Sequence, residues 1–394
     1  MVVYLKMEII IIRKDMRNFS HVFFLCTNND KIDMHKLKEN RGMFMKIKMA
    51  MCLLAGMMLI GLAGCGEDTS AKYALIVNEA SEESKYCSED VWEGLQEYVL
   101  GKPERCEKYT PESSERKDIE KTIEDAVDNG AKVVICVGKE AEVAVSEAQL
   151  DYTRVNFILL NGTPHKRYSD RDNFRDNTIA LYFNETQQGF LLGYTAVMNG
   201  YRNIGCMGGA ETETDLKIAA GFVQGVEAAG VKLGLVDGDI QLHYTFTGVD
   251  KLSPVYMSKA MDWYKNGCEI IFTLDEGVQL SVLEAAKLQS GLLLSVDVDS
   301  LETSERIVTA SAIDYAGAVT KQIDQIEGET FVGAQAVNCG VKENGVKLIL
   351  EGRGFSDNTV QEYNAMCKNL SEGTLKVEES MVLPATSITN IIKE

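Results

Sequence analysis

Apolar and polar residues alternate along most of the chain in the order of strands followed by helices. Tyr73–Val77 is an apolar run of strand length, and apolar residues recur through Ser88–Tyr98 at the spacing of one helical face. A second helical face over Ile119–Val127 stops at Asn129-Gly130, and the strand Lys132–Val137 follows. This alternation predicts a mostly parallel sheet with helices on both faces.

The pattern of one unit returns 137 residues later. Asn129–Cys136 resembles Asn266–Thr273, Val145–Ala148 matches Val282–Ala285 at the same offset, and a further apolar strand follows each copy. Gene duplication and the regular alternation of strands and helices in α/β chains both account for so short a match. Either predicts two similar lobes, which the length of 394 residues also favours because one core rarely organises so long a chain.

The segment before the first strand has the pattern of an export signal. Lys46 and Lys48 precede the apolar run Met49–Gly61, which is shorter than the roughly 20 apolar residues that span a membrane. Leu62-Ala-Gly-Cys65 follows directly and resembles the lipobox of bacterial lipoprotein precursors. That resemblance implies cleavage before Cys65 and a lipid anchor on its sulfur, outside the cytoplasm at the cell membrane. The alternative is an uncleaved anchor with a chance Leu-Ala-Gly-Cys.

Residues 1–44 fit neither a signal nor a folded domain. The run MEIIII is too short to span a membrane, and NNDKIDMHKLKENRG shows no sustained periodicity. We expect this extension to be untranslated or disordered.

Charge and cysteine content limit the kinds of ligand and partner that we expect the chain to bind. The chain carries a formal charge of −19, and without residues 1–64 there remain 30 basic and 54 acidic residues, a net of about −24. Such a surface repels phosphate backbones and no basic stripe interrupts it, which argues against nucleic-acid binding. Seven cysteines follow Cys65 without a CxxC or a Cys/His ligand spacing, so we expect no metal site and no cofactor.

Sequence motifs for catalysis are missing. The mature chain has two histidines, His165 and His243, far apart in sequence, and no GxSxG, HExxH, Walker or EF-hand pattern. Gly205–Gly209 follows a short strand but lacks the spacing of a phosphate-binding loop, and Glu211 and Glu213 beyond it would repel a phosphate. We therefore expect no enzyme, although a carboxylate pair among so many acids remains an alternative.

Polar residues stand directly after five of the predicted strands. They are Glu79, Lys139, Asn161, Asp275 and Asp297. Because ligands of open parallel sheets bind beyond the carboxyl ends of the strands, these positions predict a ligand cleft between the lobes. A helix N-cap or a solvated turn explains any one of them as well, so the prediction depends on their convergence.

Several stretches, taken in this order, resemble the basic membrane protein lipoproteins, which are purine-nucleoside-receptor-like substrate-binding proteins of ABC transporters. The stretches are Val91–Leu95, Phe183–Gly193, Ile204–Gly209 with Ala220–Phe222, Tyr264–Phe272 and Ser295–Asp299. The similarity runs from about residue 73 to 350. It implies a type I periplasmic-binding fold, in which two doubly wound α/β lobes joined by three crossovers close on a ligand by hinge motion.

The resemblance also implies how a ligand is held, with aromatic rings stacking on a purine and charged groups binding the ribose hydroxyls. Asp297 falls where the family places a ribose-binding carboxylate, and Asn161 falls where the family's strand ends in Asp. Tyr86 and Ser88 stand in place of an aromatic residue and an amide that reach the base. Ile313 stands where many members have Lys, so the scaffold is retained while the pocket is altered.

These observations predict a lipid-anchored solute-binding protein of an ABC importer. We expect a monomer that captures a small polar ligand, with a purine nucleoside as the candidate, and works with a permease and an ATPase. Two alternatives remain open, a sensor that presents its closed form to a membrane signalling partner and a lipoprotein hydrolase.

The expected segments follow from these assignments. They are an extension over 1–44, a signal peptide over 45–64, a linker over 65–71, an N-terminal lobe over 72–175 plus about 300–330, and a C-terminal lobe over 176–299 plus about 331–394.

Overall fold

The computed structural model describes residues 70–80, 82–169, 171–248, 251–350, 353 and 355–394. All of them belong to one unit, Thr69–Glu394. The expected extension, the signal peptide, the anchor residue Cys65 and the linker up to residue 69 lie outside the described residues.

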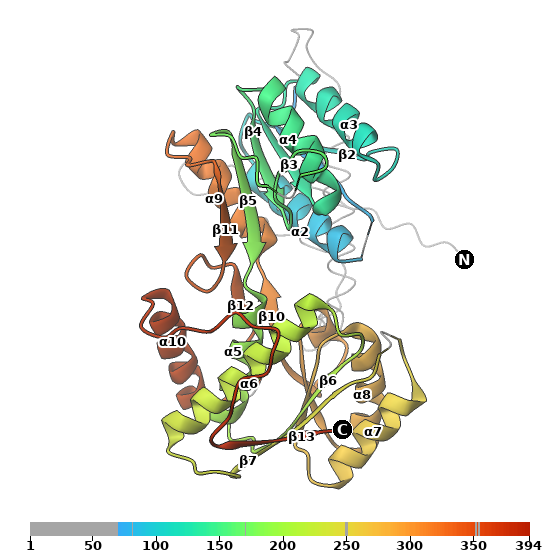
Figure 1. The fold of residues 1–394 in the computed structure, drawn as a ribbon, viewed down its shortest axis with the longest axis vertical. Coiled ribbons are helices and arrows are strands. Elements are labelled where there is room, and N and C mark those ends of the chain that lie inside the picture. The colour runs from blue at the N-terminus through green and yellow to red at the C-terminus, as the bar shows by residue number, and fades with distance from the viewer. Residues whose placement is uncertain (1–69, 81, 170, 249–250, 351–352, 354) are drawn as a thin grey trace, which may run out of the picture. The chain divides into compact units, whose positions relative to one another are not determined.

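The first lobe is built on a six-stranded parallel sheet with the order β11-β5-β4-β3-β1-β2 (Figure 1). Its strands are β1 (Tyr73–Ile76), β2 (Cys106–Tyr109), β3 (Val133–Val137), β4 (Asn156–Leu160), β5 (Thr178–Phe183) and β11 (Gln335–Cys339). Side chains of a strand alternate between its faces, so Leu75 packs on α2 (Glu82–Tyr98) and α9 (Tyr315–Glu327). Ile76 packs on the other side, against α3 (Arg116–Asp128) and α4 (Glu142–Asp151).

The second lobe is built on a seven-stranded sheet with the order β12-β10-β9-β8-β6-β7-β13. Its strands are β6 (Asn203–Gly208), β7 (Ile240–Phe246), β8 (Ile270–Thr273), β9 (Leu292–Ser295), β10 (Ile307–Ile313), β12 (Val346–Leu348) and β13 (Thr389–Lys393). Of these, β12 runs antiparallel to its neighbour.

Helices cover both faces of the second sheet as well. They are α5 (Glu185–Met198), α6 (Glu213–Leu233) and α10 (Asp357–Ser371) on one face, with α7 (Pro254–Lys265) and α8 (Glu276–Gln289) on the other. Helices α5 and α6 approach so closely that a Cβ on Gly221 would lie 1.9 Å from the carbonyl oxygen of Thr186. Only glycine permits that approach between two helix backbones.

The two sheets share one strand order. The first contains β2-β1-β3-β4-β5 and the second contains β7-β6-β8-β9-β10, so β3 and β8 occupy equivalent places. These are the two strands in the repeated stretches Asn129–Cys136 and Asn266–Thr273, and α4 and α8 after them carry the rest of the match. The repeat in sequence therefore corresponds to equivalent positions in the two lobes.

The chain crosses between the lobes after β5, after β10 and after β11. The crossovers lie side by side, since the N–H of Asn184 donates to the carbonyl of Cys339 at 3.2 Å and that of Asp314 donates to Gly345 at 3.0 Å. This arrangement differs from the expected boundaries, because β5 and β11 pair in the first sheet whereas β10 pairs in the second. An apolar run predicts a strand, but its pairing decides to which sheet it belongs.

The limits of several elements also differ from the sequence prediction. Helix α2 begins at Glu82 rather than at Ser88. The residues added before Ser88 are mostly polar in sequence, so they carry little of the apolar periodicity from which the helix was predicted. Strand β1 ends at Ile76, one residue before the predicted end, and β3 begins at Val133, one residue after the predicted start.

Candidate functional site

Each sheet has a point at its carboxyl edge where the chain turns to opposite sides. In the first lobe this point lies between β1 and β3, and in the second it lies between β6 and β8. Ligands of open α/β sheets bind at such points. The residues that follow these strands are therefore the candidates to bind a ligand, provided that their polar atoms are not already used within the protein.

Asn78 follows β1 and joins it to the end of β3. The side chain is 9% exposed, and its Nδ2 donates to the carbonyl of Val137 at 2.9 Å and to Glu140 Oε2 at 2.7 Å. Its Oδ1 accepts the N–H of Ala80 at 2.8 Å. The sequence analysis chose the exposed neighbour Glu79 and missed Asn78, although the same rule about strand ends applies to it.

Ser88 holds the turn between β1 and α2. It is buried, and its Oγ accepts the N–H of Asn78 at 3.2 Å and donates to the carbonyl of Ser84 at 2.8 Å. The hydroxyl proton is thus used within the protein. Glu79 and Lys139 are both exposed, and Lys139 opens the short helix Lys139–Ala141 that follows β3.

Asn161 lies at the end of β4 with a φ of 52°, and its N–H donates to the carbonyl of Leu181 at 2.9 Å. Asn tolerates this left-handed conformation better than most residues. The loop after it is held by Glu142, which accepts the N–H of Thr163 at 2.8 Å and lies 3.1 Å from His165 Nε2. The Lys166 carbonyl, together with Glu142, raises the pKa of His165.

Asp275 is the N-cap of α8, and both of its carboxylate oxygens accept backbone N–H groups. Oδ1 accepts from Val278 at 2.8 Å and Oδ2 accepts from Gly209 at 2.7 Å. The second bond joins the end of β8 to the end of β6. Asp275 therefore has the role in the second lobe that Asn78 has in the first.

Asp297 differs from these residues because no cation pairs with it among the described residues. Its Oδ1 accepts the N–H of Asp299 at 2.9 Å, and its own N–H donates to Ser295 Oγ at 2.9 Å. Burial raises the pKa of this carboxyl, and the negative charges of Asp299 and Glu276 raise it further. A half-buried carboxylate among other acids has capacity to accept hydrogen bonds from a ligand.

Tyr86, in the first lobe, interacts electrostatically with the carboxylate of Asp297 in the second lobe. Its ring is 43% exposed and lies edge-on to Tyr315, with 6.3 Å between the ring centroids. Burial raises the pKa of its hydroxyl to about 12, and Asp299, Asp90 and Asp297 add to the rise in that order. The structure thus brings Tyr86 within electrostatic range of Asp297, across the two lobes.

Lys139, also in the first lobe, interacts electrostatically with Glu213 of the second lobe. The pKa of Glu213 is lowered chiefly by Lys217, and the charge of Lys139 contributes to the same effect. No such connection to the opposite lobe is evident for Glu79 or Ser88 in the described part of the chain.

The sequence analysis also missed two residues beside Tyr86. Asp90 Oδ2 accepts the N–H of Ala316 at 2.9 Å and so fixes the start of α9, while Tyr315 is buried against Phe183 with 4.6 Å between the ring centroids. Tyr315 is far from Tyr86 in sequence, and no local pattern relates the two.

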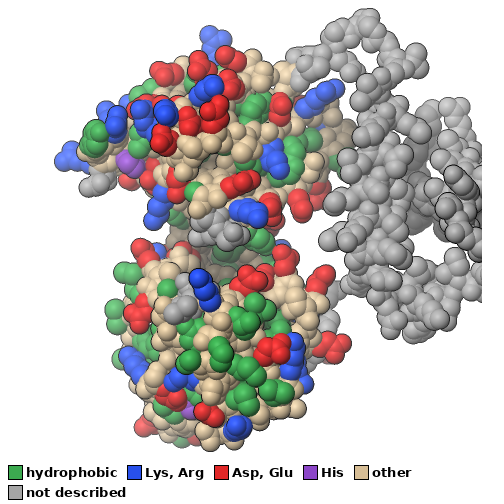
Figure 2. All heavy atoms as spheres, turned by 90° about the vertical axis from the view of Figure 1, so that its right-hand side faces the viewer, with side chains coloured by type: hydrophobic (Ala, Val, Ile, Leu, Met, Phe, Trp, Pro, Cys, Tyr) green, Lys and Arg blue, Asp and Glu red, His purple; other side chains and the backbone are tan. Residues whose placement is uncertain are grey.

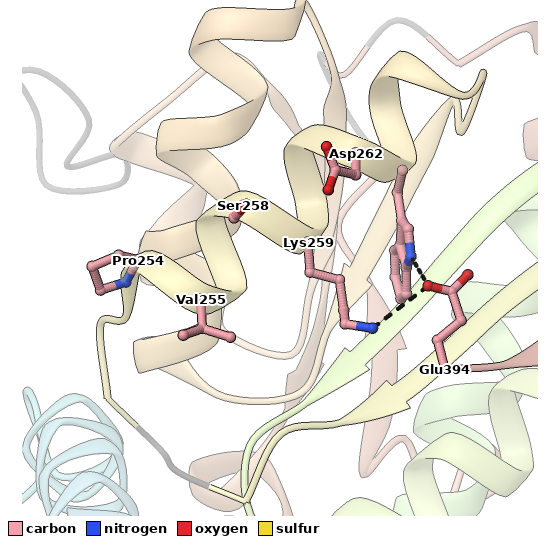
Figure 3. A pocket seen from close by; sticks show the side chains of 7 residues that line it. Pro254, Val255, Ser258, Lys259, Asp262 and Glu394 are labelled. Atoms are coloured by element: carbon pink, nitrogen blue, oxygen red, sulfur yellow. Dashed lines mark hydrogen bonds and ion pairs between the residues drawn. The ribbon is translucent and has the colours of Figure 1, made fainter.

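A cavity of about 480 Å³ lies elsewhere, between α7 and the end of β13 (Figure 3). None of the predicted ligand residues lines it. The carboxylate of Glu394 within it is already bonded to Trp263 Nε1 at 2.9 Å and lies 3.5 Å from Lys259 Nζ. Its principal acid is thus satisfied within the protein, which leaves the residues around Asp297 as the better candidate site.

Hydrophobic side chains gather on the face of the second lobe that carries α7 and α8 (Figure 2). Leu252, Val255 and Leu288 are each more than 60% exposed.

Within the described ranges, no helix combines the length and the apolar character needed to cross a membrane. The described residues also contain no group of three or more His, Cys, Asp or Glu that could hold a metal ion.

Comparisons with known proteins agree with this architecture. The sequence matches the family model Bmp, described as PnrA-like ABC transporter substrate-binding protein, over residues 72–387. A comparison with curated protein sequences gives no match.

Solved structures resemble the chain over most of its length. An ABC transporter solute-binding protein from Conexibacter woesei DSM 14684 aligns at 17% identity with a TM-score of 0.61, covering 79% of this chain and 99% of that chain. A transcriptional activator of the comK gene from Bacillus halodurans aligns at 14% identity with a TM-score of 0.60, covering 78% and 100%. A solute-binding protein from Aeropyrum pernix K1 aligns at 14% with a TM-score of 0.54, covering 78% and 93%. The likeness confirms the expected type I periplasmic-binding fold.

Proposed function

The chain belongs to the PnrA-like family of ABC transporter substrate-binding proteins, and on that premise we propose that it delivers a small polar solute, a purine nucleoside first of all, to a membrane permease. The family is one of solute-binding proteins and not of enzymes, and such proteins work outside the cytoplasm. The carboxylate of Asp297, which no cation of the described residues neutralises, is the observation that carries the nucleoside proposal.

Asp297 and Tyr86 have complementary roles in this proposal. The vicinal hydroxyls of a ribose donate two hydrogen bonds, and an unpaired carboxylate accepts both. The half-exposed ring of Tyr86 provides an apolar face for the base, and the charge of Asp297 acts on the hydroxyl of the same ring. Asn161, Glu79 and Lys139 contribute polar groups around the same strand ends, while Ser88 and Asp275 position the turns.

The anchor and the partners belong to the same proposal. Cys65 carries the lipid after removal of residues 45–64, and the protein acts as a monomer with a permease and an ATPase. Expression in a bacterial host tests the anchor, because a Cys65→Ser variant should move from the membrane fraction to the soluble fraction and lose the mass of the lipid. An unchanged mass and location would refute the anchor without affecting the ligand proposal.

Titration calorimetry with adenosine, guanosine and inosine tests the ligand. We expect one of them to bind with a 1:1 stoichiometry, and the Asp297→Asn variant to bind it more weakly. Asp237→Asn is a matched control, since Asp237 is an exposed acid of the second lobe at some distance in sequence from the strand ends. The nucleoside proposal fails if none of the three binds, or if both variants retain the affinity of the wild type.

A further inference from the structure

The loop after β4 begins with Asn161 of the proposed ligand cleft and is held against one face of α4. Glu142, Ser146 and Gln149 share that face, because they are spaced four and three residues apart on the helix. Ser146 Oγ accepts a side-chain N–H of Asn173 at 2.7 Å, and Gln149 Nε2 donates to the carbonyl of the same residue. Ser146 and Gln149 are both buried, so the far end of the loop is fixed within the protein.

Glu142 holds the near end of the loop with both of its carboxylate oxygens. Oε1 accepts the N–H of Thr163 at 2.8 Å, and Oε2 lies 3.1 Å from Nε2 of His165. The loop also packs directly on this side chain, since a Cβ on Gly162 would lie 3.0 Å from Glu142 Cγ. Glu142 therefore fixes the residues that follow Asn161.

His165 has a hydrogen-bond acceptor beside each of its ring nitrogens. Nδ1 lies 3.1 Å from the carbonyl oxygen of Lys166, and Nε2 lies 3.1 Å from the carboxylate of Glu142. A neutral imidazole has one N–H and satisfies one of these acceptors, whereas the imidazolium form donates to both. The geometry thus favours the charged form, and the pKa of His165 is raised by the Lys166 carbonyl and by Glu142 against the opposing effect of burial.

Other charged and titratable groups surround the same contact. They are Lys166 and Asp172 of the loop, of which Asp172 forms a β-bridge with His165, and Tyr182 of β5, whose hydroxyl lies 2.6 Å from Thr163 Oγ1. Lys166 and Asp172 are exposed, and burial raises the pKa of Tyr182, so its hydroxyl stays protonated at neutral pH. Histidine is the side chain whose charge ordinarily changes near neutrality, so we assign the pH response of this contact to His165.

We propose that Glu142 is a positioning residue for the ligand, and that the charge of His165 sets how firmly Glu142 holds the loop that begins at Asn161. The inference rests on the proposed function, since the loop affects a ligand only if the cleft binds one. Below the ordinary histidine pKa of 6.5 the contact is complete and its stabilisation is fully present. As the pH rises through the higher value of the folded protein, the ion pair and one hydrogen bond are lost, and ligand affinity falls.

A nuclear magnetic resonance titration of the histidine ring protons in the full chain tests the contact without a ligand. The His165→Gln variant assigns the signal of His165 by its disappearance. We expect His165 to titrate above pH 6.5, and Glu142→Gln to lower its midpoint towards that value. A midpoint at or below 6.5, or one that Glu142→Gln leaves unchanged, would overturn the proposal.

Calorimetry with adenosine, guanosine and inosine at pH 6 and pH 8 tests the effect on the ligand. The wild type should bind its nucleoside about three- to tenfold more weakly at pH 8, whereas His165→Gln should bind it equally at both values. His243→Gln is the matched control and should retain the pH dependence, because His243 lies 2.9 Å from a carboxylate oxygen of Glu394 in the second lobe. Asp297 is present in all of these proteins, so its own titration cancels from the comparison.

Two substitutions of Glu142 separate positioning from folding. Glu142→Ala removes the acceptor of the Thr163 N–H and should weaken binding at both pH values, whereas Glu142→Gln retains an oxygen there and should restore affinity without the pH dependence. The proposal is overturned if the wild type and His165→Gln share one pH profile, or if Glu142→Gln binds as weakly as Glu142→Ala. If no nucleoside binds at either pH, the proposed function and the ligand effect both fail, while the His165 titration still decides the contact itself.

Discussion

The strand ends of the two lobes are built alike in one place and differently in another. Asn78 joins the ends of β1 and β3 in the first lobe, and Asp275 joins the ends of β8 and β6 in the second. Each residue uses its polar atoms within the protein, mostly on backbone groups, at the point where ligands of such sheets usually bind. Asp297, one strand further along the second sheet, has a carboxylate that pairs with no cation among the residues described.

The difference shows that a polar residue after a parallel strand has two distinct uses. At the centre of each sheet it replaces backbone hydrogen bonds that the separating strands lose, and its removal should affect stability. Beside the centre it is available to a ligand, and its removal should affect affinity. Variants of these three residues should therefore divide into two classes.

The largest effect is expected for Asn78→Ala, which removes three hydrogen bonds from a buried position and leaves the N–H of Ala80 without its acceptor. We expect the free energy of unfolding to fall by about 2–4 kcal/mol. Urea unfolding followed by circular dichroism measures it. Asn78→Asp is the matched control, since it retains the acceptor for Ala80 but places a carboxylate beside Glu140, and it should also destabilise. If the Asn78→Ala variant were as stable as the wild type, Asn78 would not belong to the residues that stabilise the sheet.

Asp297→Asn should reduce nucleoside affinity by about 1.5–3 kcal/mol, which is roughly 10- to 100-fold in the dissociation constant. The amide retains an oxygen for the N–H of Asp299, so the fold should be unaffected. Calorimetry gives the affinity, and urea unfolding of the same variant gives the stability. A loss of stability as large as that of Asn78→Ala would place Asp297 in the structural class instead.

Asp275→Ala should lower the free energy of unfolding by about 1–2 kcal/mol, because α8 loses its N-cap and Gly209 loses an acceptor. Its effect on affinity should be small compared with that of Asp297→Asn. If calorimetry found the reverse order, the carboxylate of Asp275 would be a ligand group and the comparison between the two strand ends would fail.

The smallest effect concerns pH and Asp297. Its pKa is raised by burial and by Asp299 and Glu276, so the folded protein holds this proton more tightly than the unfolded chain does. The stability that the group contributes is fully present below its ordinary pKa, near 3.8, and is lost as the pH rises through the raised value. Asp297→Asn should therefore melt slightly above the wild type at neutral pH, and the difference should shrink towards pH 3.8.

Differential scanning calorimetry of both proteins between pH 3 and pH 8 measures this difference, with Asp237→Asn as the control that should show none. Tyr86, on which the charge of Asp297 acts, stays protonated throughout this range, because its own pKa is raised to about 12. A constant difference in melting temperature across the range would contradict the assigned cause.

Much of the scaffold could be predicted because it depends on local pattern. Apolar runs predicted the strands whose carboxyl ends surround the candidate site. The repeat over Asn129–Cys136 and Asn266–Thr273 predicted strands in equivalent positions of the two lobes. The pairing of β5, β10 and β11 could not be predicted in this way, since a short apolar strand fits either sheet. Their assignment depends on neighbours that are distant in sequence.

The sequence alone determined that this chain is an alternation of strands and helices in two similar halves, with polar residues after its strands, because burial imposes periodicity wherever an element packs. Only the tertiary structure decided which of those polar side chains already use their hydrogen-bonding atoms within the protein. Asn78, Ser88 and Asp275 use their atoms mostly on nearby backbone, whereas the charge of Asp297 acts on Tyr86 of the other lobe. The physical reason is that a hydrogen-bond partner is a matter of distance in space, which the order of residues does not contain.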